Sequence, residues 1–196
     1  MKSRRSLLKR SRLCLILDKP GFDIRASGIG IIQLRDKISA KPDILKSALK
    51  LARRLRRSNT LLIVNDHPDL ALLSGADGVH LGQADMPLDK ARLILGKEMI
   101  IGVSCHNLAQ ALKAQKQGAD YIGIGPIYAT ATKPEYKPIG LKVLKQLEGK
   151  IKIPYFAIGN INKNNIAKII STGCRRAAVC RAAGAAKDLL KELQVK

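Results

Sequence analysis

The sequence predicts an α/β fold in which eight parallel strands close into a barrel. Eight short apolar runs recur at near-even intervals along the 196 residues, and stretches with helical spacing separate them. Most of these runs are almost continuously hydrophobic, as expected for parallel strands that are covered on both faces. Strand and helix then alternate to the end of the chain. An open doubly wound sheet shares this pattern. The number of strands favours the barrel, and so does the lack of an adenine-nucleotide fingerprint, because Gly28-Ile-Gly30 precedes a strand instead of closing a strand-to-helix turn.

Proline and glycine mark the limits of the expected elements. Pro42, Pro68 and Pro87 stand where helices begin, and glycines stand where helices end. The expected strands are Leu13–Leu17, Ile29–Leu34, Thr60–Val64, Gly78–Leu81, Met99–Val103, Tyr121–Ile124, Pro154–Ile158 and Ala177–Cys180. The expected helices are Asp43–Arg57, Pro68–Ser74, Pro87–Leu95, Asn107–Gln117, Leu141–Leu147, Lys163–Ser171 and Ala185–Leu193.

The first strand-helix unit is abnormal. Only Asp18–Ser27 separates the first two strands, which is too short for a full crossover helix, so we expect the first helix to be shortened or missing. The basic N-terminal segment, residues 1–11, is a candidate for a helix that covers the lower end of the barrel. Residues 12–196 are then the barrel domain, and the length suits a single core.

Composition bounds the partners and the compartment. The net charge of +21 raises nucleic acid as a partner, but the six cations of residues 46–57 lie on one face of an amphipathic helical stretch, and aromatic content is only 3%. Both observations argue against nucleic-acid binding as the main role. No apolar run is long enough to span a bilayer, the N-terminus lacks a signal-peptide pattern, and the four cysteines show no metal-binding spacing. We expect a cytoplasmic protein; the oligomeric state is left open.

Two carboxylates at predicted strand ends, Asp66 and Asp85, stand between the cationic motifs Gln33-Leu-Arg-Asp-Lys37 and Thr130-Ala-Thr-Lys133. Mg²⁺ takes one or two protein carboxylates and fills its other positions with water and substrate phosphates. The combination predicts a site for Mg²⁺ and a diphosphate. Taken alone, each aspartate could equally cap the helix that follows it, and the cationic motif could be solvated surface charge.

These segments, together with Gly102-Val-Ser-Cys-His106 and Ala119-Asp-Tyr-Ile-Gly-Ile-Gly-Pro126, resemble thiamine-phosphate synthases and their tautomerase-like paralogues across residues 13–183. The resemblance implies a (β/α)8 TIM barrel that joins a pyrimidinylmethyl diphosphate to a thiazole phosphate and releases diphosphate. Arg35, Lys37, Lys133 and Mg²⁺ would neutralise the departing diphosphate, so that catalysis is electrostatic and positional.

The resemblance also implies a role for each matching residue. The pyrimidine diphosphate would contact Gln33, Arg35, Lys37, Asn65, Ser104 and Lys133, of which Arg35, Lys37 and Lys133 would be catalytic. The thiazole phosphate would contact Thr130, Thr132, Gly159, Cys180 and Arg181, and the metal ligands would be Asp66 and Asp85. His67 and His80 are expected to be structural.

The chain departs from the family pattern near the thiazole phosphate. Asn160 replaces the second glycine of a Gly-Gly-Ile turn, a mild change because asparagine tolerates left-handed geometry. Arg181 stands where the family has a small hydroxyl residue, which predicts altered substrate preference or lowered activity. Two alternatives therefore stay open: a thiazole tautomerase with His106 as the proton-transfer group, and a non-catalytic protein that binds thiamine precursors or holds RNA.

Overall fold

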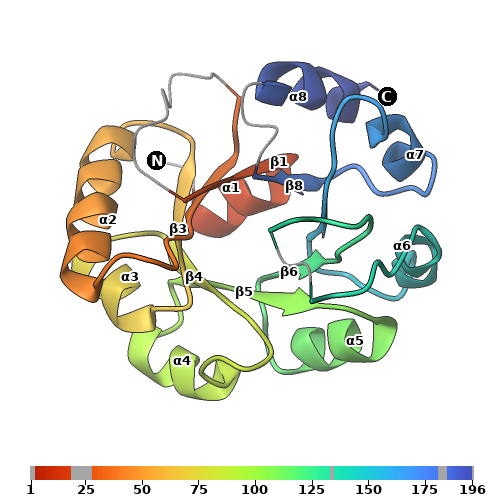
Figure 1. The fold of residues 1–196 in the computed structure, drawn as a ribbon. Coiled ribbons are helices and arrows are strands. Elements are labelled where there is room, and N and C mark those ends of the chain that lie inside the picture. The colour runs from red at the N-terminus through yellow and green to blue at the C-terminus, as the bar shows by residue number, and fades with distance from the viewer. Residues whose placement is uncertain (1–2, 19–27, 133–134, 181–184, 196) are drawn as a thin grey trace.

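The computed structural model describes residues 3–18, 28–132, 135–180 and 185–195. Eight parallel strands form a closed barrel in sequence order (Figure 1), which confirms the predicted fold. Closure is made by β8 on β1, where Leu13 lies opposite Ala177. The strands are β1 (Leu13–Leu17), β2 (Ile31–Leu34), β3 (Leu61–Asn65), β4 (Gly78–Leu81), β5 (Ile100–Cys105), β6 (Tyr121–Ile124), β7 (Tyr155–Ile158) and β8 (Ala177–Val179). All eight predicted strands are present, three with the predicted limits and five with limits that differ by one or two residues.

The helices surround the barrel. They are α1 (Arg4–Arg10), α2 (Lys41–Leu55), α3 (Pro68–Ser74), α4 (Leu88–Leu95), α5 (Leu108–Lys116), α6 (Lys142–Leu147), α7 (Ile166–Ile170) and α8 (Ala186–Gln194). In α2 the buried residues Ile44, Ala48, Leu51 and Leu55 recur at helical spacing and face the strands. The six cations of residues 46–57 are all exposed, as expected for the solvated face of this helix.

The basic N-terminal segment forms helix α1, which lies across the end of the barrel where the strands begin (Figure 1). Leu8 on this helix is 2% exposed and belongs to the cluster inside the barrel. Arg4 donates to Asp77 and Arg5 to Asp120, each at 2.9 Å, and these aspartates precede β4 and β6. The helix therefore closes this end with the buried Leu8, the partly buried Leu7 and two ion pairs. The shortened or missing first helix concerns residues 18–27, and residues 19–27 lie outside the described part of the chain.

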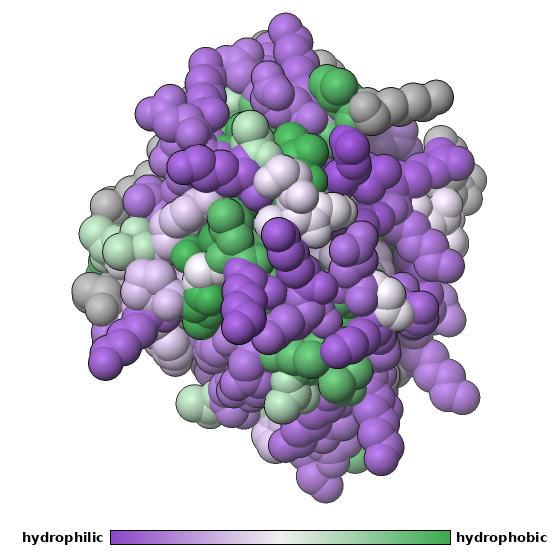
Figure 2. Space-filling model, turned by 90° about the vertical axis from the view of Figure 1, so that its right-hand side faces the viewer, coloured by the Kyte–Doolittle hydropathy of each residue, from purple (hydrophilic) through white to green (hydrophobic). Residues whose placement is uncertain are grey.

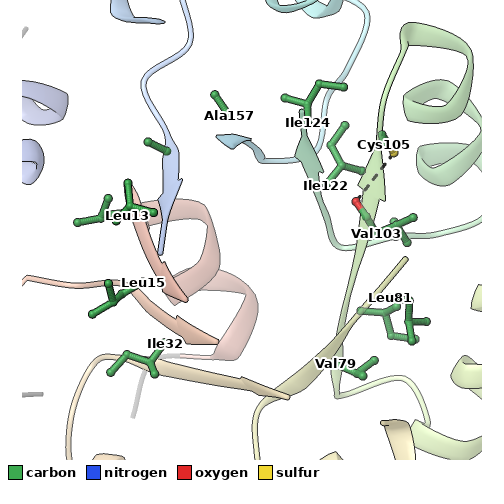
Figure 3. Close-up of a cluster of buried hydrophobic side chains, with 14 of the residues drawn as sticks. Leu13, Leu15, Ile32, Val79, Leu81, Val103, Cys105, Ile122, Ile124 and Ala157 are labelled. Atoms are coloured by element: carbon green, nitrogen blue, oxygen red, sulfur yellow. Dashed lines mark hydrogen bonds between the residues drawn. The ribbon is translucent and has the colours of Figure 1, made fainter. Parts of the chain in front are cut away.

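Alternation along each strand divides the core into two layers. Leu13, Leu15 and Leu17 point outward to a layer between strands and helices, part of which Figure 3 shows, whereas Cys14 and Ile16 point into the barrel. The inner layer also contains Ile31, Leu61, Ile63, Ile100, Tyr121, Phe156 and Ala178. The lower barrel is thus filled with side chains, and the main cavity lies toward the carboxyl ends of the strands.

The side of the molecule that carries α5 to α8 is mostly hydrophilic, with small separate apolar areas (Figure 2). This surface agrees with the helices presenting one apolar face to the barrel and a polar face to water. Within the described part of the chain, none of the helices has the length and apolar character needed to cross a bilayer.

Candidate active site

A polar layer lines the barrel interior near the carboxyl ends of the strands. Gln33 on β2, Asn65 on β3 and His80 on β4 are all less than 10% exposed. The Gln33 amide donates to the Asn65 side-chain oxygen at 2.7 Å, and the Cys14 thiol lies 3.9 Å from the Gln33 oxygen. Buried amides that are bonded to each other hold a fixed orientation, so this layer presents a defined pattern of donors and acceptors.

Above this layer lies a cavity of about 500 Å³, formed at the ends of β5 to β8 and by the loops that follow them. The structure brings six of the predicted substrate contacts to its wall: Arg35, Ser104, Thr130, Thr132, Gly159 and Cys180. Gln33 and Asn65 line a smaller adjoining space that shares Arg35 and Ser104 with the larger cavity. Lys133 and Arg181 lie outside the described residues. One connected space therefore joins residues that the sequence assigned to two different substrates.

Asp66 and Asp85 lie together beside Lys37, at the ends of β3 and β4. The Lys37 ammonium donates to Asp66, and the Gly82 N–H donates to Asp85 at 2.6 Å. Burial raises the pKa of Asp85, and the hydrogen bond and charge of Asp66 raise it further. A hydrogen bond from one carboxyl to the other shows that the two groups are close enough to hold one cation jointly.

The capping alternative for these aspartates is wrong. Helix α3 has His67 at its N-cap and α4 has Pro87, and neither helix end receives a side-chain cap. Asp66 instead has a φ of +64°, in the left-handed region that asparagine and aspartate tolerate best. Such backbone geometry is concentrated at functional sites.

The donor set fits a hard cation. In the part of the chain that the structure describes, no group of three or more His, Cys, Asp or Glu residues could hold a metal, so a site with several nitrogen or sulfur ligands is not built there. Two adjoining carboxylates suit Mg²⁺, which keeps several waters or phosphate oxygens among its ligands. Neither Asp66 nor Asp85 lines the main cavity or the smaller space beside it.

Both ring nitrogens of the buried His80 have hydrogen-bond partners. Its Nδ1 lies 3.0 Å from the Tyr121 hydroxyl and its Nε2 lies 2.9 Å from Ser104 Oγ. Ser104 lines the main cavity, so a hydrogen-bonded chain runs from the barrel interior to the cavity wall. Tyr121 was not among the predicted site residues. The alternation of β6 was the signal that could have placed it inside the barrel.

His106 also lies at the wall of the main cavity. Its Nδ1 is 2.6 Å from the Gly125 carbonyl oxygen, so Nδ1 carries the proton and Nε2 can accept one. The ring stacks on Tyr136, with centroids 4.7 Å apart. His67 is half-buried at the start of α3 and lines neither the main cavity nor the smaller space beneath it.

The loop after β7 shows why the change from glycine to Asn160 is tolerated. Asn160 has a φ of +51°, which asparagine adopts more readily than most residues. Gly159 has a φ of +109°, and a Cβ there would lie 2.7 Å from Pro126 Cα. Only glycine fits at Gly159, because the backbone of the loop after β6 passes directly against it.

The fold and the site define a (β/α)8-barrel protein whose polar residues gather where barrels of this class place their working groups, at the carboxyl ends of the strands. The chain belongs to the thiamine monophosphate synthase family, whose model matches residues 23–183.

Named relatives agree with this placement. The chain is 44% identical to the thiamine-phosphate synthase of Synechococcus sp. (strain WH7803), over 94% of this chain and 56% of that protein. It is 47% identical to the thiamine-phosphate synthase of Clostridium acetobutylicum, over 74% of this chain and 69% of that protein. A solved structure, thiamine phosphate pyrophosphorylase from Pyrococcus furiosus, superposes with a TM-score of 0.83 at 31% identity and covers 97% of this chain and 99% of its own. The chain spans only about half the length of some of its relatives, such as those from Synechococcus and Gloeobacter violaceus.

Proposed function

We propose that this protein is a thiamine-phosphate synthase, a transferase that joins 4-amino-2-methyl-5-pyrimidinylmethyl diphosphate to a thiazole phosphate and releases diphosphate. The observation that carries the proposal is the position of the Lys37, Asp66 and Asp85 cluster. It lies at the ends of strands whose neighbours open into a cavity large enough for two small phosphorylated molecules.

The pyrimidine would bind in the polar layer inside the barrel. Gln33 and Asn65 offer amide groups to an aminopyrimidine edge, and Ser104 and Arg35 face both this space and the cavity above it. The diphosphate would then lie toward Arg35 and Lys37. Arg35 supplies a planar fork for phosphate oxygens, and Lys37 supplies a mobile point charge.

The Asp66 and Asp85 carboxylates would hold Mg²⁺, which supplies positive charge to a departing diphosphate. Their mutual repulsion and the raised pKa of Asp85 are the features that a bound cation relieves. The protein's own task is to orient both substrates and to keep water from the reacting carbon. Thr130 and Thr132 would contact the thiazole phosphate, with Gly159 and Cys180 on the facing loops. The resemblance assigns further contacts to Lys133 and Arg181.

The test combines purified protein, Mg²⁺ and the two substrates, and follows thiamine phosphate and diphosphate by mass spectrometry. We expect both products in equal amounts, and loss of both with chelator. The Asp66→Asn variant should lose activity at limiting Mg²⁺. Asp69→Asn is the matched control. Asp69 lies on α3, three residues after Asp66, and forms an exposed ion pair with Lys41 of α2 at 2.9 Å. Full activity of Asp66→Asn at limiting Mg²⁺ would contradict the metal assignment.

The second candidate is a thiazole tautomerase, favoured by the position of His106 at the cavity wall, with Nδ1 bonded to the Gly125 carbonyl oxygen. This reaction does not need the Lys37, Asp66 and Asp85 cluster. If the protein isomerises a thiazole phosphate without Mg²⁺, makes no coupled product, and loses that turnover in His106→Ala, the tautomerase replaces the synthase. Tight binding of both substrates with neither reaction would instead support a precursor-binding protein. We propose that the synthase acts in the cytoplasm.

A further inference from the structure

Three side chains from neighbouring strands form a hydrogen-bonded chain inside the barrel. Tyr121 on β6 contacts His80 on β4, although β5 runs between them. The register explains this contact. Gly102 on β5 is the partner of His80 on one side and of Tyr121 on the other. A glycine at this position leaves room for the two rings to meet across the strand. A Cβ on Gly102 would lie 2.2 Å from Tyr121 Cζ and 2.6 Å from His80 Nδ1.

The chain continues from His80 to Ser104, two residues after Gly102 on the same inward face of β5. The hydrogen bonds of this chain can be donated in only two directions. Either Tyr121 donates to Nδ1, Nε2–H donates to Ser104, and the Ser104 proton points onward, or every bond runs the opposite way. The environment of the two ends decides between these directions.

Tyr121 is 2% exposed, and within the described part of the chain its hydroxyl has one hydrogen-bond partner, His80. If the chain ran toward the tyrosine, the buried O–H proton would have no acceptor there, and buried donors are almost always paired. Burial also raises the pKa of Tyr121 well above its usual value, so the hydroxyl keeps its proton. A doubly protonated His80 would leave the same tyrosine proton unpaired.

The other end of the chain is open. Ser104 lines both the main cavity and the smaller space beneath it, so its proton can find water or substrate there. We propose that Tyr121 is a positioning residue that holds His80 in the Nε2–H tautomer and thereby makes Ser104 a hydrogen-bond donor toward an anion in the cavity. Identifying that anion as the substrate's diphosphate rests on the proposed function.

The consequence for Ser104 is specific. A serine hydroxyl has one proton and can act as donor or acceptor, and near a diphosphate only the donor role is favourable. The His80 Nε2–H donates to the Ser104 oxygen, so the Ser104 hydroxyl cannot donate to His80. The Ser104 proton must therefore point toward the cavity. A donor that is already oriented costs no reorganisation when negative charge develops nearby.

The first measurement is independent of activity. Long-range ¹H–¹⁵N spectra of the wild-type protein should show His80 with a protonated Nε2 and an unprotonated Nδ1. In Tyr121→Phe, which keeps the ring and removes only the hydroxyl, the Nδ1–H form should become populated. A wild-type His80 protonated at Nδ1, or at both nitrogens, would overturn the proposal. Tyr155→Phe is the matched control, since it removes a hydroxyl from a half-buried tyrosine on β7 that is not part of the chain.

The second measurement tests the coupling to Ser104. We expect Tyr121→Phe to weaken binding of inorganic diphosphate in the presence of Mg²⁺, and to lower kcat, each by about tenfold as a charge-assisted donor is weakened. The KM for the thiazole phosphate should not change. In a Ser104→Ala background, Tyr121→Phe should have no further effect, because the tyrosine acts only through the serine.

Additive losses in the double variant would overturn the proposal, since they would show that Tyr121 acts by another route. These outcomes separate the two claims. If the wild-type protein forms no coupled product, the synthase assignment fails, while the tautomer spectra and the diphosphate-binding cycle still decide the direction of the chain.

Discussion

Replacing Asp120 with alanine should lower the free energy of unfolding by about 2 to 3 kcal/mol without impairing substrate binding. Asp120 precedes β6 at the end of the barrel opposite the cavity, and its side chain is 10% exposed. It accepts hydrogen bonds from Arg92 at 2.7 Å, from Arg5 at 2.9 Å and from the Ile101 backbone N–H at 2.9 Å. One carboxylate thus joins α1, α4 and β5.

The magnitude follows from the exposure of these partners. The Arg5 side chain is 46% exposed, so its ion pair contributes only about 0.5 kcal/mol. Arg92 is 23% exposed, and a charge-assisted bond there contributes about 1 kcal/mol. The Ile101 N–H starts a barrel strand, and leaving it without its acceptor costs about 1 kcal/mol.

Urea denaturation measures this difference directly. With a slope of about 2 kcal/mol per molar urea, the midpoint should fall by about 1 to 1.5 M at constant slope. Asp89→Ala is the control, because Asp89 is 64% exposed and its nearest cation, Lys90, is 4.0 Å away. Asp89→Ala should change the midpoint very little. An Asp120→Ala loss below about 0.5 kcal/mol would refute the reasoning that this carboxylate joins the three elements.

Three further outcomes are expected. Leu8→Ala should cost about 3 kcal/mol in thermal or urea unfolding, since Leu8 is 2% exposed inside the barrel end, and a loss near zero would show that α1 does not close it. Asp85→Asn should leave the metal-free protein as stable as wild type or up to about 1 kcal/mol more stable, because the substitution relieves repulsion with Asp66. Mg²⁺ should no longer raise the melting temperature of this variant. A melting temperature that Mg²⁺ still raises would contradict the site. Burial and Asp66 raise the pKa of Asp85, so a proton competes with Mg²⁺ up to a higher pH than it would at an ordinary carboxyl. The Mg²⁺ affinity measured by calorimetry should therefore increase with pH from about pH 4 and then level off. An affinity that does not change with pH would contradict the assignment.

The sequence alone was sufficient for the fold and for bringing the two aspartates together. Continuous apolar runs such as Leu13–Leu17 mark strands covered on both faces, and the strand-end positions of Asp66 and Asp85 predicted that both would lie at one edge. These inferences succeed because they depend on local periodicity and on a general property of parallel sheets. Local pattern could not decide whether the aspartates cap helices, because capping depends on backbone angles such as the positive φ of Asp66.

The tertiary structure decided which distant residues meet. His80 carried no motif of its own, and Tyr121 belonged to an ordinary apolar strand, yet the register of β4, β5 and β6 places both beside Gly102 and connects them to Ser104. A shift of one residue in any of these strands would turn the same side chains outward. Periodicity along one strand determines which face a residue occupies, but the partner across a strand depends on the closure of the whole barrel. That closure is a property of all eight strands together.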